Sequence, residues 1–185
     1  MIKSIILSGL PVSGKTTLAK KLSEIHHWPV FSVGQLWRDE WRQRYPDGKI
    51  SFEEFWRHTT IEENHRKNHE ARKVFQKGQV IGDTRYAVYC RDLPALLIFV
   101  TANLQTRAYR AARMDEYLGL SFQEIESTLQ EREEDEVRMG KKLYGEQYDY
   151  RDPRHYHMTL NTEMLTLEEE VAAIENLMLV CNMRT

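Results

Sequence analysis

Short apolar segments rich in β-branched residues alternate along the chain with longer amphipathic segments. This alternation is typical of strand–helix crossover units, and it predicts a parallel sheet with helices packed on it. The longer segments between the apolar runs are expected to be helices. We expect five strands, at Ile2–Leu7, Val30–Ser32, Val80–Gly82, Leu96–Val100 and His157–Leu160.

Local sequence signals mark the ends of several expected helices. In the capping box S/T-x-x-E, the hydroxyl and the carboxylate each bond a backbone N–H group that the helix leaves unpaired, so a helix is expected to begin there. Gly78 and Gly119 lie where helices are expected to end. The capping boxes are Ser51 with Glu54, Ser121 with Glu124, and Thr166 with Glu169.

The segment 51–77 carries many charged residues and few apolar ones. We expect much of it to be helical and packed on one side only, with a solvated face. The tryptophans gather in and around the second expected strand, where they either stack on a base or form a satellite core, and we favour the core. They are Trp28, Trp37, Trp41 and Trp56.

Length and charge narrow the class of protein. At 185 residues the chain is expected to fold as a single domain over 1–185. A net charge of −2 gives no basic field, so nucleic-acid binding is not expected. Cys90 and Cys181 are too few for a disulfide framework, and no apolar stretch has the length of a membrane span. We therefore expect a cytoplasmic protein with no membrane partner.

The stretch GLPVSGKTT at residues 9–17 lies between the first expected strand and the helix after it. It matches G-x-x-x-x-G-K-[ST], a phosphate-binding loop, whose glycines let backbone N–H groups point at phosphate oxygens beside a positive helix N-terminus. Lys15 is expected to reach the β- and γ-phosphates of ATP, and the Thr16 hydroxyl to ligate the Mg²⁺ between them. We assign nucleotide binding to Gly9, Ser13, Gly14, Lys15, Thr16 and Thr17, with Ser13 as a turn residue and Thr17 as a packing or capping residue.

A phosphate loop alone does not separate kinases from switches or motors, so a second anion site is needed. Arg38 follows the second expected strand, Arg85 follows the third, and Arg132 lies on the expected helix STLQEREEDEVR. Ligands of an open parallel sheet bind at the carboxyl ends of its strands, so Arg38 and Arg85 are expected beside the phosphate loop. Asp83 follows the third strand, where a carboxylate suits Mg²⁺ as well as a substrate.

Seven blocks of sequence run in order along most of the chain. They are IILSGLPVSGKTTLAKKL, FSVGQLWR, SFEEF, VIGDTRYA, LIFVTANLQTRAYRAAR, EREEDE followed by LYG, and LNTEMLTLEEEV. Together they resemble the P-loop nucleoside monophosphate kinases, most closely the archaeal-type cytidylate kinases. The resemblance implies a three-layer α/β P-loop NTPase fold, with a five-stranded parallel sheet of order 2-3-1-4-5 and helices on both faces. It also implies a small acceptor-binding helical segment at 33–78, a short lid at 113–121, and a monomer.

The resemblance also implies roles for individual residues. In the family, the arginine of the second block holds the acceptor phosphate, which implies Arg38. The acidic residue and the arginine after the third strand contact the monophosphate and its base, which implies Asp83 and Arg85. The arginine of the sixth block reaches the phosphates on closure, which implies Arg132, with Glu136 beside it as a substrate-binding residue. Arginines before the lid contact ATP or the transferring group; they are Arg107, Arg110 and Arg113, of which we place Arg110 with Lys15 and Arg132 in the catalytic set.

Two positions depart from the family pattern. The family helix has a second arginine seven residues after the first; here position 139 is methionine, and the arginine is Arg138. A slip of one residue turns a helical side chain by about 100° from the expected face, and we keep Arg138 among the substrate-binding candidates. Between Asp83 and Arg85 the family has glycine, whereas this chain has Thr84, whose β-branched side chain restricts the backbone.

These residues and the resemblance predict transfer of the γ-phosphoryl group of Mg·ATP to a nucleoside monophosphate, CMP or dCMP first and UMP second. Two alternatives stay open: a P-loop kinase for another small acceptor, and a switch or partner-binding module that binds ATP without phosphoryl transfer. The displaced Arg138 and the polar segment 51–77 favour the second alternative. His65 and His69 have metal-ligand spacing on an expected helix, but without a third ligand we expect no metal there.

Overall fold

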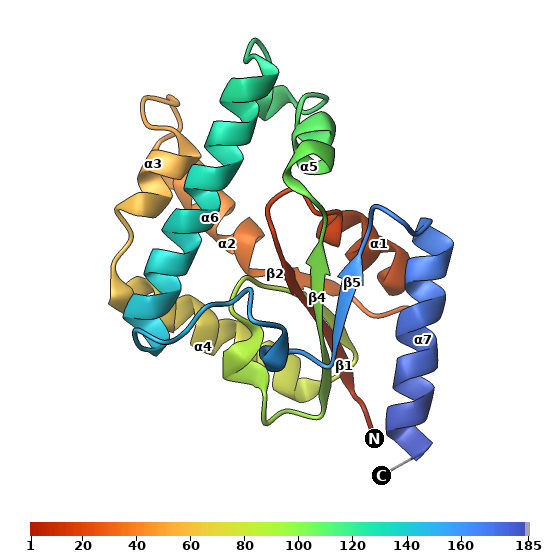
Figure 1. Cartoon of the computed structure of the whole chain (residues 1–185). Coiled ribbons are helices and arrows are strands. Elements are labelled where there is room, and N and C mark those ends of the chain that lie inside the picture. Colours follow the sequence, from red (N-terminus) through yellow and green to blue (C-terminus); the bar gives the residue numbers. More distant parts are fainter. Residues whose placement is uncertain (184–185) are drawn as a thin grey trace.

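In the computed structural model, which describes residues 1–183, five parallel strands form a sheet in the order β2-β3-β1-β4-β5 (Figure 1). The expected number of strands, their direction and their order are therefore confirmed. β2 has the expected bounds, and the bounds of the other strands differ from the expected ones by at most two residues at either end. The strands are β1 (Ser4–Gly9), β2 (Val30–Ser32), β3 (Val80–Asp83), β4 (Ala95–Thr101) and β5 (Met158–Asn161).

β1 lies at the centre of the sheet, and all of its residues are buried. It pairs with β3 on one side, where Leu7 lies opposite Asp83, and with β4 on the other, where Gly9 lies opposite Val100. A parallel strand covered on both faces is apolar along its length, which explains the run of isoleucine and leucine at its start. Asp83 and Gly9 thus end neighbouring strands at the carboxyl edge of the sheet, where ligands bind in open α/β folds.

Helices cover both faces of the sheet, so the molecule has three layers (Figure 1). On one face α1 and α7 bury Leu22 and Ile174 against the strands. On the other face α2, α3 and α4 bury Trp37 and Phe75. These helices are α1 (Lys15–His26), α2 (Val33–Arg44), α3 (Phe52–Arg57), α4 (Ile61–Lys77) and α7 (Leu167–Met183).

α6 (Phe122–Tyr144) runs from the carboxyl edge of the sheet to α4 (Figure 1). Its first half packs against α5 (Leu104–Ala111), and its second half packs on a tyrosine cluster made of Tyr86, Tyr148 and Tyr150. Three short 3₁₀ helices complete the described elements: η1 (Ala87–Cys90), η2 (Asp115–Tyr117) and η3 (Pro153–His155).

The capping signals place helix starts correctly. The hydroxyl of Ser51 accepts a hydrogen bond from the N–H of Glu54, and Ser121 with Glu124 forms the full reciprocal box. Thr166 and Glu169 also bond each other's backbone N–H groups, at the start of α7. The expected helix starts are therefore confirmed at all three sites.

The segment 51–77 is mostly helical, as expected, and it divides into α3 and α4 at residues 58–60, where Thr60 forms a capping box with Glu63. Gly78 does end α4, but the expectation for Gly119 is wrong, because Gly119 ends no α-helix. α5 already stops at Ala111, and Gly119 instead adopts a positive φ of 85° in the turn between η2 and α6.

The tryptophans serve mainly as packing residues. Trp37 is only 4% exposed, and Trp41 packs beside it and donates a hydrogen bond to the carbonyl of Ile50. Trp28 stacks on the ring of His26, outside this cluster. Trp56 is partly buried, and both Trp37 and Trp56 also line the cavity described below. The core interpretation is thus confirmed for Trp37 and Trp41.

Residues 1–183 hold no group of three or more His, Cys, Asp or Glu side chains placed to bind a metal ion. None of the helices in that part of the chain is long and apolar enough to cross a membrane. Cys90 is buried, and burial raises the pKa of its thiol to about 12, which suits a packing residue better than a nucleophile.

Candidate active site

The loop between β1 and α1 requires glycine at two positions. A Cβ atom on Gly9 would lie 2.0 Å from the carbonyl oxygen of Val100, so any side chain there would collide with β4. Gly14, at the start of α1, has a φ of 101°, and Val12 has a φ of 58°. These left-handed conformations are the kind from which backbone anion-binding nests are built. The local geometry thus suits a phosphate group at the N-terminus of α1.

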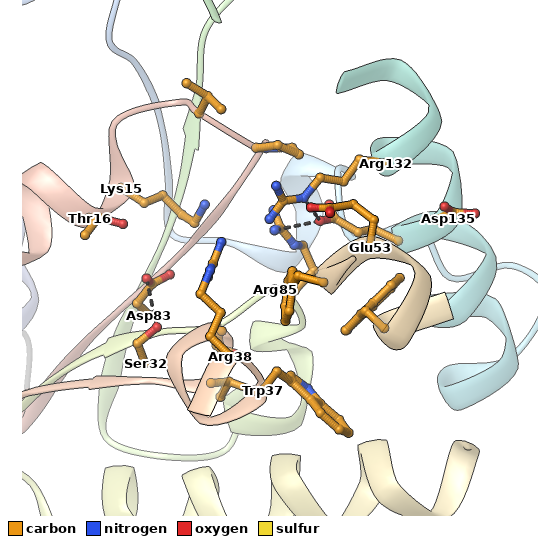
Figure 2. Close-up of a pocket in the computed structure, with 18 of the residues that line it drawn as sticks. Lys15, Thr16, Ser32, Trp37, Arg38, Glu53, Asp83, Arg85, Arg132 and Asp135 are labelled. Carbon is orange, nitrogen blue, oxygen red and sulfur yellow. Dashed lines mark hydrogen bonds and ion pairs between the residues drawn. The ribbon is translucent and has the colours of Figure 1, made fainter. Parts of the chain in front are cut away.

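Five cationic side chains line one cavity beside this loop. Arg57 is paired with Asp135 and Glu131, and the four others come from four parts of the chain (Figure 2). Lys15 comes from α1, Arg38 from α2, Arg85 from the turn after β3, and Arg132 from α6. Their charged ends gather at the centre of Figure 2. The cavity has a volume of about 230 Å³, which is room for a small molecule. The structure therefore brings together all the cations that the sequence assigned to the loop and to the acceptor phosphate.

The surroundings of these cations lower the pKa of two of them. The pKa of Lys15 is lowered to about 8, first by burial and then by the nearby charge of Arg85, against the opposing effect of Asp83. Burial also lowers the pKa of Arg38, with Arg132 as the next contributor. A bound anion would relieve this repulsion, because each positive charge would gain a partner.

Glu136 organises two of the arginines. Its carboxylate is 5% exposed, lies 2.7 Å from the guanidinium of Arg85 and 3.4 Å from that of Arg132, and accepts a hydrogen bond of 2.9 Å from the Tyr150 hydroxyl. Arg85 also donates to the carbonyl of Gly9, at 2.5 Å. Glu136 therefore fixes both arginines relative to the phosphate loop, in addition to lining the cavity.

The expected lid segment lies at the mouth of the cavity. Met114, Glu116 and Tyr117, all within 113–121, line it. Glu116 lies 3.6 Å from Arg132. Burial raises the pKa of the Glu116 carboxyl, and a hydrogen bond with Glu53 of α3 raises it further. Side chains of this segment and of the helices at 33–78 thus meet across the mouth.

Asp83 and Thr16 offer oxygen ligands of the type that a magnesium ion binds. Both line the cavity, one at the end of β3 and the other in the first turn of α1. Ser32 donates a hydrogen bond of 3.2 Å to the Asp83 carboxylate, which helps to hold it in place. A carboxylate and a hydroxyl are hard oxygen ligands of the type that Mg²⁺ takes alongside water and phosphate oxygens. The residues present therefore fit this ion.

Arg107 and Arg110 of α5 contact the backbone of the phosphate loop without lining the cavity. Arg110 donates to the carbonyl of Ser13 at 3.2 Å and to Thr162 at 2.8 and 2.9 Å. Arg107 is buried, donates to the carbonyl of Pro11 at 3.3 Å and pairs with Glu133. The guanidinium of Arg110, assigned to catalysis from the sequence, is thus bonded to backbone of the loop and is not among the groups lining the cavity.

Arg113 and Arg138 are not brought to the cavity. Arg113 donates to the hydroxyl of Tyr109 on the surface. Arg138 is 61% exposed and pairs with Asp135 and Glu134, while the next residue, Met139, is buried in the tyrosine cluster. The inner face of α6 therefore passes through position 139, and the slip of one residue turns the Arg138 guanidinium outward. Its assignment to substrate binding is corrected accordingly.

Several lining residues were not found from the sequence. Thr84 was noted only as a departure from the family; it is buried and accepts a hydrogen bond of 3.1 Å from the Tyr89 hydroxyl. Asn64 and Asn68 are both buried on α4 and line the far end of the cavity. Their spacing of four residues, which places them on one helical face, was the available signal. Other lining residues that were missed include Ser32, Glu53, Arg57, Glu116, Thr128 and Asp135.

Comparison with known proteins agrees with this geometry. A model of the cytidylate kinase-like family matches residues 4–164. The cytidylate kinase of Methanopyrus kandleri is 29% identical over 185 residues, covering 92% of this chain and 90% of that protein. That of Desulfurococcus amylolyticus is 32% identical over 184 residues, covering 96% and 92%. The shikimate kinase of Bacteroides thetaiotaomicron shares the fold, with a TM-score of 0.61 at 14% identity, over 98% of this chain and 99% of that one. The chain therefore belongs to the cytidylate kinase-like family.

Proposed function

We propose that this protein transfers the γ-phosphoryl group of Mg·ATP to a pyrimidine nucleoside monophosphate, with CMP and dCMP as preferred acceptors and UMP second. Membership of its family makes the chain an ATP-dependent nucleoside monophosphate kinase, and the choice of base is what is proposed. The observation that carries the phosphate-bearing acceptor is the set Lys15, Arg38, Arg85 and Arg132 around one cavity, and the choice of base follows the names of the relatives. Several cations around one small space suit two phosphate groups and the charge that passes between them.

Phosphoryl transfer needs two substrates held in line, with negative charge neutralised as the phosphoryl group moves. In this proposal, Lys15 and the N–H groups of the loop bind the phosphates of ATP. Arg38 and Arg85 hold the phosphate of the acceptor, and Arg132 stabilises the transferring group. When bound by Thr16 and Asp83, Mg²⁺ neutralises charge on the β- and γ-phosphates.

The two alternative functions are less well supported by the site. An acceptor without a phosphate group would leave Arg38 and Arg85 without an anionic partner. A module that had lost transfer through the displacement of Arg138 would be short of cationic groups, yet five of them line the cavity without that residue. Both considerations favour a monophosphate acceptor and a working enzyme.

The test is a coupled ADP-release assay with Mg·ATP against CMP, dCMP, UMP, AMP, GMP and dTMP. A reaction without acceptor and the variant Lys15→Met are the controls. We expect CMP or dCMP to give the highest kcat/KM, and we expect the variant to lose at least about 100-fold, because the loop loses its only side-chain cation.

Two outcomes would contradict the proposal. Turnover led by a purine monophosphate would overturn the choice of base but keep the class of reaction. ADP release that no acceptor raises above the control would overturn the acceptor, and shikimate-type or sugar-type acceptors would be tried next.

We also propose that the enzyme acts as a cytoplasmic monomer without nucleic-acid or membrane partners. A cavity lined by residues of a single chain supports the monomer, because no second copy is needed to complete it. Sedimentation equilibrium at assay concentrations tests it, and a dimer mass would contradict it.

A further inference from the structure

The cavity has two chemically different ends. One end holds Lys15 and the arginines, beside the phosphate loop. At the other end lie Trp37 and α4, which passes below it in Figure 2. That end offers aromatic rings and two uncharged amides, Asn64 and Asn68. Arg57 also lines the cavity, but its guanidinium is paired with Asp135 and Glu131. A nucleoside monophosphate has the same division, with a phosphate at one end and a flat polar base at the other. The α4 end is therefore the place for the base.

The hydrogen bonds of Asn64 fix the orientation of its amide. Its Nδ2 donates to the Oγ1 of Thr59 and to the carbonyl of Thr60, both at 2.9 Å. The Thr60 carbonyl can only accept. The Thr59 hydroxyl gives its own proton to the carbonyl of Trp56, at 2.7 Å, so it too must accept from Asn64. Both partners thus require the NH₂ group, and a flipped amide would place two acceptors against each other.

The carbonyl oxygen of Asn64 is therefore the atom left for a ligand. Within residues 1–183, no protein donor bonds this Oδ1, and it is not among the atoms sealed away from solvent without a partner. The side chain is 3% exposed and lines the cavity. Asn64 thus presents a hydrogen-bond acceptor, and not a donor, to whatever occupies the α4 end.

We propose that the Oδ1 of Asn64 accepts a hydrogen bond from the exocyclic 4-amino group of cytosine, and that this contact separates CMP from UMP. The inference rests on the proposed function. Uracil carries a carbonyl oxygen at that position, so two acceptors would face each other. A buried acceptor without a partner is unfavourable, and the locked amide cannot rotate to offer its NH₂ group instead.

Asn68 differs from Asn64 because its hydrogen bond does not fix the orientation of its amide. Its Nδ2 lies 2.7 Å from the hydroxyl of Tyr144, a group that can donate or accept. The Asn68 amide can therefore turn over and keep its bond, so it suits either base. Asn68 is the matched control, because it lies one turn along the same helix and lines the same cavity.

The test compares CMP, UMP and the monophosphate of 2-pyrimidinone riboside, which has hydrogen in place of the 4-amino group. Each is assayed with the wild type, Asn64→Leu and Asn68→Leu. In the wild type we expect CMP to lead each of the others by roughly 10- to 100-fold in kcat/KM. Asn64→Leu should remove that lead by slowing CMP, while the 2-pyrimidinone substrate changes by less than about threefold.

Asn68→Leu separates recognition from folding, since it should lower CMP and UMP in the same proportion. Equal losses for all three substrates in Asn64→Leu, with the preference intact, would overturn the inference and leave the kinase standing. So would an equal shift of the CMP to UMP ratio in Asn68→Leu. No turnover of any monophosphate by the wild type would overturn the proposed function and this inference together.

Discussion

At the scale of single residues, Arg38 shows how position decides the role of a charge. It comes from α2, stacks over the ring of Phe52 at 4.9 Å, and lines the cavity. Arg42, one turn further along the same helix, pairs with Asp39 on the surface, and both side chains are more than half exposed. An exposed pair of this kind contributes little, whereas a cation facing a phosphate group in a cavity forms a strong charge-assisted bond.

We therefore predict that Arg38→Ala raises the KM for the monophosphate by roughly 10- to 100-fold, with the KM for ATP within about twofold of the wild type. Steady-state kinetics with each substrate varied in turn measures both values. Arg42→Ala is the matched control and should leave both constants unchanged. A rise in the KM for ATP equal to that for the monophosphate would mean that Arg38 serves the other phosphate group.

Lys15 couples proton binding to nucleotide binding. Its pKa is lowered to about 8, first by burial and then by the charge of Arg85. At pH 8.5 most free enzyme would hold this amine uncharged, whereas the phosphates of ATP favour the charged form. ATP binding should therefore take up a proton, and its affinity should fall as the pH rises through about 8.

Calorimetry at pH 8.5, in two buffers of different ionisation enthalpy, measures this uptake. We expect roughly half a proton or more per ATP in the wild type. Lys15→Arg, whose guanidinium stays charged at this pH, and Lys15→Met, which has no amine, should show none. The same uptake in Lys15→Met would assign the proton to another group.

Glu136 is the clearest case of a residue that acts through others. Its carboxylate is shared by Arg85 and Arg132, and each of the three side chains is less than 20% exposed. Removing one charge from a buried group of this kind leaves the others unpaired. We predict that Glu136→Gln lowers the free energy of unfolding by about 3 kcal/mol, measured by urea denaturation. Glu134→Gln, at an exposed position two residues away on α6, should change it by less than about 0.5 kcal/mol, and equal effects of the two variants would contradict the assignment.

At the scale of elements, the start of α4 both caps its helix and holds the side chain of Asn64. Thr60 and Glu63 form the capping box there, and the Thr60 carbonyl also holds the amide of Asn64. We predict that Thr60→Ala lowers the free energy of unfolding by about 1 kcal/mol, because the hydroxyl that accepts from the Glu63 N–H is lost. Ser127→Ala, on the exposed side of α6, should change it by less than about 0.5 kcal/mol in the same denaturation experiment. A loss no larger than that of the control would mean that the cap is redundant.

The break between α3 and α4 shows where sequence reasoning fails for elements. The strands were found because buried parallel strands leave short apolar runs, and the three capping boxes named their helix starts. At 58–60 the chain has His58, Thr59 and Thr60, with no glycine or proline to mark a stop. The Thr60 signal was present, but it lies inside a segment that has charged residues on both sides of it. Gly119 failed for the opposite reason, since glycine also serves turns that end no α-helix.

The residues of the site likewise divide into those that the sequence predicts and those that it does not. The phosphate loop is a local motif, and Arg38 and Arg85 follow strands that end at one edge of the sheet, so topology alone places them together. Asn64, Glu53 and Glu116 come together only because α3, α4 and the segment 113–121 pack around the cavity. No spacing rule along the chain supplies that packing. Position on α6 was decisive in one further case, since one residue separates the exposed Arg138 from the buried face.

At the scale of the whole molecule, the cavity is enclosed by segments that do not belong to the sheet. The helices at 33–78, the segment 113–121 and α6 all contribute lining residues, and α5 with α6 projects beyond the sheet (Figure 1). Their charged groups affect one another: the charge of Arg132 lowers the pKa of Arg38, and both arginines oppose the rise in the pKa of Glu116. Without an anion between them, the cations oppose closure; a phosphate group on each substrate would reverse that balance.

We therefore predict that the segments 33–78 and 113–121 become ordered together when both substrate sites are filled. Hydrogen exchange would compare the free enzyme, the enzyme with inorganic phosphate, and the enzyme with a bisubstrate analogue in which cytidine and adenosine are joined through five phosphates. The analogue should slow exchange in both segments by about tenfold or more, because opening would then separate bound phosphates from their arginines. Phosphate alone should have a smaller effect, since a single phosphate ion cannot fill both substrate sites. β1, already buried throughout, is the internal reference and should not change. Slowing confined to the phosphate loop would show that 113–121 does not act as a lid, because water would then reach the cavity as easily with both substrates bound as without them.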